Sequence, residues 1–121
     1  MIFLDTCILI DCSKDKIVLD LKQNYCISSI VRLEFKAGAL NKRELKKINR
    51  ILSQIKLVDT DQSILNLADS LMEKYTLSHG MSIYDSIIAA TCLVYDLPLW
   101  TYNKKDFKYI EELELTDEHN N

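Results

Sequence analysis

The chain has little glycine and proline and no long apolar run. Its 121 residues include two glycines, Gly38 and Gly80, and a single proline, Pro98. A P-loop and a Gly-x-Gly-x-x-Gly dinucleotide turn both need several glycines close together, so this composition excludes them. No apolar run approaches the ~20 residues of a membrane span, so we expect no membrane partner.

Cysteine pairs with the spacing of a metal site are also missing. The four cysteines, at positions 7, 12, 26 and 92, form no Cys-x-x-Cys pair and have no nearby histidine. We therefore expect reduced thiols that pack as small hydrophobes, and no zinc site. The N-terminus has no basic region before Asp5, so it does not resemble a signal peptide. We therefore expect a cytoplasmic protein.

The charge is weakly negative and unevenly distributed. A net charge of −3 argues against strong non-specific binding of nucleic acid. Residues 111–121 hold five acidic residues and no Lys or Arg, and without these five charges residues 1–110 carry +2. We expect a frayed acidic tail from about residue 116, after a last short strand.

Short apolar segments alternate with helical patterns along the chain. We expect strands at residues 2–5, 25–28, 56–58, 97–100 and 113–115. We expect helices at residues 6–13, 17–22, 28–40, 42–55, 59–79 and 82–94, with Ser82 as a cap and Gly80 as a terminator. This alternation predicts one domain over residues 1–121, a three-layer α/β/α sandwich with a short parallel sheet. Sites in such sheets form at the carboxyl ends of the strands.

Four acidic residues interrupt the apolar patterns. Asp5 ends the first strand, Asp106 lies just beyond the fourth, and Glu34 and Asp85 are expected on the inward faces of helices. A buried carboxylate is costly unless it is paired or binds a metal, and no buried Lys or Arg matches these four. Oxygen ligands without His or Cys favour hard cations such as Mg²⁺ or Mn²⁺. The sequence therefore predicts a cation site formed by the four acids.

Each acid also has an ordinary structural interpretation. Asp5 can be a helix cap, and Glu34 can be a partly exposed helix residue. Asp85 stands three residues after Ser82, which resembles a capping box and suits the helix dipole. Asp106 can be a loop acid. The joint pattern is far more specific than any of its members.

The order of these motifs resembles the PIN-domain family, and above all its VapC-type toxins, over essentially the whole chain. The motifs are Asp5-Thr6 after a strand, Ser29 to Glu34, Asp85-x-x-Ile88-Ala89-Ala90, and Thr101-x-Asn103-x-x-Asp106-Phe107. The resemblance implies an endoribonuclease dependent on Mg²⁺ or Mn²⁺, in which the four acids are the catalytic metal ligands and the metal activates a water. It implies that Thr6, Thr101 and Asn103 contact these ligands or the metal's waters.

The resemblance also implies partners: an RNA substrate, a small antitoxin protein that inhibits the toxin, and a second copy of the chain in a homodimer. One departure from the family pattern is Cys7, which occupies a place where Asn or Ser is common. This departure affects a minor polar contact.

Basic and aromatic residues supply further candidates for RNA contacts. One helix face carries five basic residues, and three more flank Asp106: Lys42, Arg43, Lys46, Lys47 and Arg50, then Lys104, Lys105 and Lys108. Both sets can attract the RNA backbone, and a solvated surface is the alternative. Tyr102 is a candidate for base stacking, whereas Trp100 is expected in the core and His79 at a helix C-terminus.

Two other functions have the same general architecture. A non-catalytic PIN-like module that binds RNA or protein would not need a divalent cation. A receiver-type signalling domain is also a parallel α/β sandwich with an acidic pocket. It normally has paired acids after the first strand and a lysine after the last strand, and this sequence lacks both features.

Overall fold

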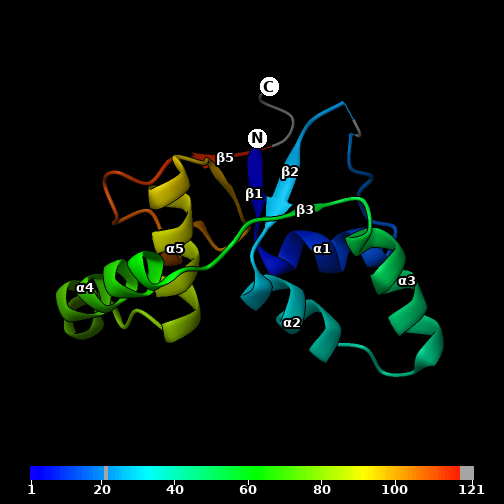
Figure 1. Ribbon diagram of the computed structural model, residues 1–121, viewed down its shortest axis with the longest axis horizontal. Coiled ribbons are helices and arrows are strands. Elements are labelled where there is room, and N and C mark those ends of the chain that lie inside the picture. The colour runs from blue at the N-terminus through cyan, green and yellow to red at the C-terminus, as the bar shows by residue number, and fades with distance from the viewer. Residues whose placement is uncertain (21, 118–121) are drawn as a thin grey trace.

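The computed structural model describes residues 1–20 and 22–117 (Figure 1). Within them, five short strands form one parallel sheet in the order β3-β2-β1-β4-β5. The strands are β1 (Ile2–Leu4), β2 (Tyr25–Ile27), β3 (Lys56–Leu57), β4 (Leu99–Trp100) and β5 (Leu115–Thr116). Because β1 is the central strand, the residue that follows it lies between the ends of β2 and β4.

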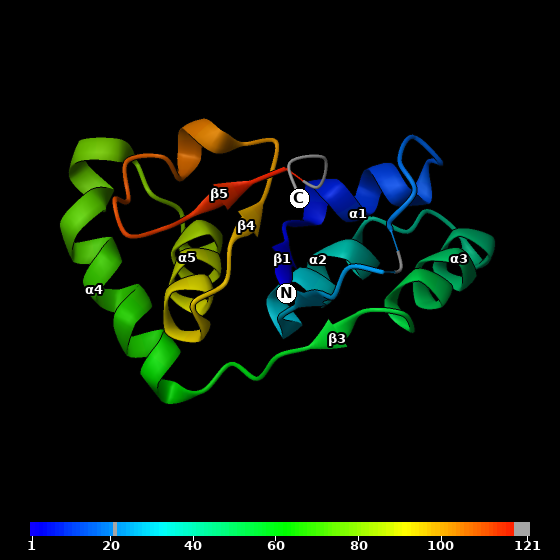
Figure 2. The ribbon, with the colours of Figure 1, turned by 90° about the horizontal axis from the view of Figure 1, so that it is seen from above.

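Helices cover both faces of the sheet (Figures 1 and 2). They are α1 (Thr6–Ser13), α2 (Ser29–Ala37), α3 (Lys42–Leu52), α4 (Gln62–His79) and α5 (Ile83–Tyr95). The first three pack on one another, and α4 packs against α5. The predicted three-layer α/β/α sandwich is therefore confirmed. None of the helices described here has the length and apolar character needed to cross a bilayer.

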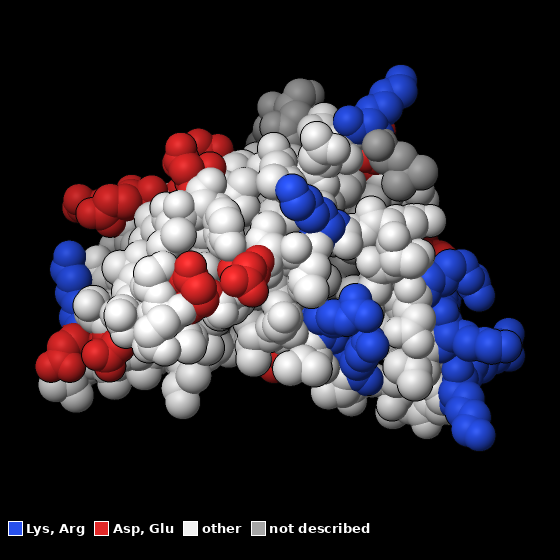
Figure 3. All heavy atoms as spheres, in the orientation of Figure 1, with Lys and Arg blue, Asp and Glu red and all other residues white. Residues whose placement is uncertain are grey.

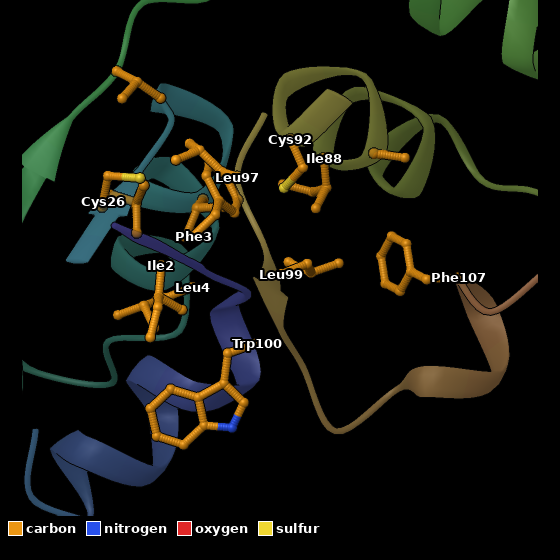
Figure 4. Close-up of a cluster of buried hydrophobic side chains, with 14 of the residues drawn as sticks. Ile2, Phe3, Leu4, Cys26, Ile88, Cys92, Leu97, Leu99, Trp100 and Phe107 are labelled. Carbon is orange, nitrogen blue, oxygen red and sulfur yellow. The ribbon is translucent and has the colours of Figure 1, made fainter. Parts of the chain in front are cut away.

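Buried apolar side chains hold the ends of the central strands and the loop after β4 in place. Phe3 of β1 is level with Cys26 of β2 on one side and with Leu99 of β4 on the other. Leu99 and Phe107 are fully buried and lie beside α5, which contributes the buried Ile88 (Figure 4). A buried Phe or Leu contributes about 1.5–3 kcal/mol, so Phe107 anchors the loop that follows β4.

Local signals set the helix ends as predicted around the α4–α5 turn. Gly80 ends α4 with a left-handed φ of 64°, a conformation that glycine adopts without strain. The Ser82 hydroxyl then caps α5 by accepting a hydrogen bond from the Asp85 amide at 3.0 Å. Asp61 caps α4 in the same way, through the amide of Ile64 at 3.0 Å.

Several element bounds differ from those predicted. The helix expected at residues 17–22 is wrong for the described part of that segment, since residues 17–20 have no regular structure and residue 21 lies outside the description. Ile17 and Leu19 pack on the core while Val18 is 86% exposed, an alternation that suits extended chain. The last strand begins two residues later than expected and includes Thr116, and residues 118–121 of the expected tail are outside the description.

Candidate active site

Asp5 is a buried carboxylate held at the end of the central strand. Its side chain is 3% exposed. Oδ1 accepts hydrogen bonds from the Thr6 amide at 2.7 Å and the Tyr84 hydroxyl at 2.9 Å, and Oδ2 accepts one from the Thr101 hydroxyl at 2.7 Å. These donors come from α1, from α5 and from the chain after β4. All three are neutral, so Asp5 is positioned while its negative charge stays uncompensated.

Thr101 is oriented by its own neighbours. Its hydroxyl oxygen accepts a hydrogen bond from the Asn103 amide at 3.0 Å, which leaves its hydrogen for Asp5. The Cys7 sulfur accepts from the Tyr102 amide at 3.5 Å and lies 3.8 Å from the Thr101 hydroxyl. Burial raises the pKa of the Cys7 thiol, so it stays neutral. Cys7 thus contacts Thr101, the threonine that donates a hydrogen bond to Asp5.

Tyr84 is a site residue that the sequence analysis missed. It lies in the first turn of α5, and its hydroxyl contacts both the Asp5 carboxylate and the Thr6 hydroxyl. Burial, and then the charge of Asp5, raise the pKa of Tyr84, which keeps the phenol a hydrogen-bond donor. The only sequence signal was its position beside Asp85, because its partner lies 79 residues earlier.

The charges of the other three acids act on the pKa of Asp85. It is half-buried in the first turn of α5. Burial raises its pKa to about 6, the hydrogen bond with Ser82 opposes that rise, and the charges of Asp106, Asp5 and Glu34 add to it. Like charges act on a pKa in this way only over short distances. The fold therefore brings three acids that are far apart in sequence close enough to Asp85 for their charges to act on it.

The structure corrects the expected burial of two acids. Glu34 and Asp106 are exposed, so the expected inward orientation is wrong for Glu34. The buried residues of α2 are Val31 and Phe35, a different face from the one that Glu34 shares with Ala37. Within the described chain, no three His, Cys, Asp or Glu side chains form a compact cluster able to hold one metal ion. Exposed carboxylates have room to move apart, as their mutual repulsion favours.

The two sets of basic candidates occupy different places. Lys104, Lys105 and Lys108 are exposed around Asp106, and Lys104 forms an ion pair with Asp117 at 3.5 Å. The set on α3 gathers at the end of the molecule away from α4 (Figure 3). There Lys47 pairs with Asp15 at 2.9 Å.

A groove of about 910 Å³ lies over the junction of α1, α2 and α3. Its lining combines apolar Ile10, Phe35, Leu40 and Ile48 with the charged residues Lys14, Arg43, Glu44, Lys47 and Arg50. Three of the five α3 cations therefore border an apolar groove. The groove is lined by none of the four acids.

Known proteins resemble this chain over nearly its whole length. The PIN domain profile matches residues 2–113. Ribonuclease VapC1 of Methanocaldococcus jannaschii is 31% identical over 116 residues, covering 94% of this chain and 84% of that protein. The crystal structure of VapBC2 from Rickettsia felis, bound to a DNA fragment from its promoter, has a TM-score of 0.82 at 25% identity and covers 96% of this chain and 98% of that chain. A toxin–antitoxin complex from Klebsiella pneumoniae has a TM-score of 0.75 at 26% identity, with 93% and 95% covered.

Replacing Tyr84 with Phe removes one of the two donors to Asp5 Oδ1 and retains the packed ring. We expect the free energy of unfolding at neutral pH to fall by about 1–2 kcal/mol, measured by urea denaturation. Tyr95→Phe is the matched control, because its hydroxyl bonds to the Asp59 carbonyl at an exposed site. It should cost less than about 0.5 kcal/mol. Equal losses in both variants would contradict the role of Tyr84.

Replacing Asp85 with Asn should stabilise the fold in a pH-dependent way. The folded pKa of about 6 lies above the ordinary 3.8, so folded protein holds the proton more tightly and loses stability as the pH rises between these values. Above this window we expect Asp85→Asn to gain about 1 kcal/mol, after allowance for solvent screening, or about 4 °C in Tm. Thermal denaturation in EDTA at about pH 7 and about pH 4 should show the gain only at the higher pH.

Exposed Asp69 on α4 provides the control for this experiment, because Asp69→Asn should shift Tm little at either pH. A gain for Asp85→Asn of the same size at both pH values would show that the carboxylate charge is not the cause.

Proposed function

This chain belongs to the PIN-domain family, and we propose from that premise that it is a VapC-type ribonuclease toxin that uses Mg²⁺ or Mn²⁺. Its relatives include a protein named as a ribonuclease and a solved toxin–antitoxin complex. The observation that carries the proposal is the buried Asp5 carboxylate at the end of the central strand, which only neutral donors hold and which lies near the other three acids. These four residues are the proposed catalytic acids.

The donor atoms of the four acids are of the kind that a hard divalent cation prefers. The four candidate ligands offer only oxygen, which Mg²⁺ and Mn²⁺ prefer. None of the four forms an ion pair with a described residue, so their charge is not neutralised locally. The β1–β2 register, extended by two residues, places Ser28 level with Asp5. Its buried hydroxyl has no partner among the described residues and would suit a water of a hydrated ion.

The chemistry proposed is hydrolysis of an RNA phosphodiester. A water oxygen bonds to phosphorus as the bond to the 3′ oxygen breaks, which leaves a 5′-phosphate and a 3′-hydroxyl. A bound divalent cation supplies charge stabilisation and lowers the pKa of water. Asp5, held by Thr6, Tyr84 and Thr101, would be one ligand fixed in place, and Asp85, Glu34 and Asp106 would supply the other carboxylate oxygens.

The test is cleavage of an RNA pool by the purified chain with Mg²⁺, with Mn²⁺, or with EDTA, alongside Asp85→Asn. We expect cleavage that requires a divalent cation, yields 5′-phosphate ends, and falls at least about 100-fold in the variant. Asp69→Asn, which changes an exposed acid outside the site, is the activity control.

A fully active Asp85→Asn variant would contradict the assignment of the acids. No cleavage together with no binding of Mn²⁺ in calorimetry would favour the alternative, a non-catalytic module that binds RNA or protein.

For the protein partner, we propose that an antitoxin helix occupies the groove between α1, α2 and α3. The apolar lining suits the apolar face of an amphipathic helix, and Arg43 and Arg50 suit acidic residues beside it, whereas Lys47 is paired with Asp15 and Glu44 adds one negative charge. Leu40 lines the groove and is 85% exposed, so it is available to a partner. A basic side chain at one end of the same partner would extend toward the acids.

Leu40→Asp tests this surface because it changes an exposed side chain and should leave the fold intact. We expect affinity for the cognate antitoxin to fall at least about tenfold in calorimetry, with RNA cleavage unchanged. Leu65→Asp on α4, where Leu65 is 40% exposed, is the control. Unchanged antitoxin binding, with loss of self-association in sedimentation, would assign the groove to a homodimer instead.

A further inference from the structure

An aromatic cluster of three residues joins the end of α4 to the chain after β4. The His79 and Tyr109 rings are stacked, with centroids 4.0 Å apart and planes 12° apart. Tyr75 meets Tyr109 edge-on at 4.8 Å and His79 at 5.7 Å. We call these three residues the aromatic stack. The proposed hydrolysis makes no use of it.

The aromatic stack lies beside the acids of the candidate active site. His79 is the last residue of α4, and Asp85 is in the first turn of the next helix. Tyr109 follows Asp106 by three residues, in the same loop anchored by Phe107. Burial raises the pKa of Tyr109, and the charges of Asp85 and then Asp106 raise it further, as expected for a ring close to both. The stack therefore joins the end of α4, shortly before Asp85 in the sequence, to the loop that carries Asp106.

His79 is the exposed member of the stack. Tyr75 is buried and Tyr109 is half-buried, whereas His79 is exposed. Because one face of the imidazole covers Tyr109, we infer that the opposite face of the ring is the accessible one. The Ser78 hydroxyl bonds to His79 Nδ1 at 2.7 Å and helps to fix the plane of the ring.

Two cations are neighbours of members of the stack. Lys74 Nζ lies 5.2 Å from the centroid of the buried Tyr75, and the exposed Lys108 precedes Tyr109 in the sequence. Aromatic faces with nearby cations are the usual means of binding single-stranded nucleic acid, since bases stack on the rings and cations attract the backbone. A purely structural contact between the two segments would not require the outermost ring to be exposed.

We propose that the exposed face of His79, stacked on Tyr109, binds a nucleobase next to the phosphodiester held at the acids. Lys108 and Lys74 attract the backbone on either side. This inference rests on the proposed function, because it concerns how the same site holds RNA. The subsite reads the presence of a base and not its identity, since every base has a face that can stack.

The experiment measures RNA binding separately from cleavage. In an Asp85→Asn background, fluorescence anisotropy compares a labelled single-stranded RNA of random sequence with an abasic chain of equal length. We expect His79→Ala to weaken binding of the base-bearing RNA between about 5-fold and about 100-fold and to leave the abasic chain unaffected. His79→Phe retains a stacking ring and should retain the preference for bases.

Tyr95→Ala is the control, since Tyr95 is an exposed aromatic residue at the opposite end of α5. A His79→Ala variant that loses affinity equally for both RNAs, or for neither, would overturn the subsite. If the unsubstituted chain still cleaves RNA in that case, the proposed nuclease stands without it. A chain that neither cleaves nor binds RNA would overturn both proposals.

Discussion

The candidate site depends on the burial of one carboxylate, that of Asp5. Removing such a group from water costs several kcal/mol unless hydrogen bonds replace those of the solvent. Three short bonds do so here, and the Asp5 amide also donates to the Trp100 carbonyl at 3.1 Å. The donors belong to elements on both sides of the sheet, so the carboxylate can be satisfied only when those elements are correctly packed.

The neutrality of the donors matters as much as their number. An arginine or lysine beside Asp5 would have offset its charge and left little attraction for a cation. Hydroxyl and amide donors fix the carboxylate without neutralising it, and the same field acts on Asp85 at the start of α5. The packing around Asp5 therefore keeps negatively charged side chains near one another, whereas apolar side chains at the same positions would not repel one another.

The sequence predicted the parts of this arrangement that depend on local patterns. The alternation of strands and helices, the cap at Ser82 and the turn at Gly80 are all local, and all three were predicted correctly. The four acids could be selected because each interrupts a local pattern. The face of α2 was misjudged because small residues near Glu34 resemble core residues, although Val31 and Phe35 are the ones that pack inward.

Contacts between distant residues could not be predicted in the same way. Nothing in the sequence near Tyr84 indicates that its hydroxyl meets Asp5, and nothing near His79 indicates that Tyr109 covers its ring. Such contacts can be inferred only once the strand order is known, because β1 and β4 are far apart in the sequence but neighbours in the sheet.

The acids and the groove are separate surfaces, but two helices connect them. Asp5 caps α1, and Ile10 near the other end of that helix lines the groove, about 8 Å further along the axis. On α2, Glu34 and Phe35 are adjacent in sequence, one among the acids and one in the groove. A partner seated in the groove would therefore contact the same two helices that position Asp5 and Glu34.

Two of the residues that hold Asp5 are synthesised long after Asp5 itself. Asp5 leaves the ribosome before Tyr84 and Thr101, which follow 79 and 96 residues later. Until β4 emerges, β1 has no neighbour on that side. A nascent chain therefore carries the carboxylate without the contacts that position it, and the centre is assembled only after Thr101 has emerged.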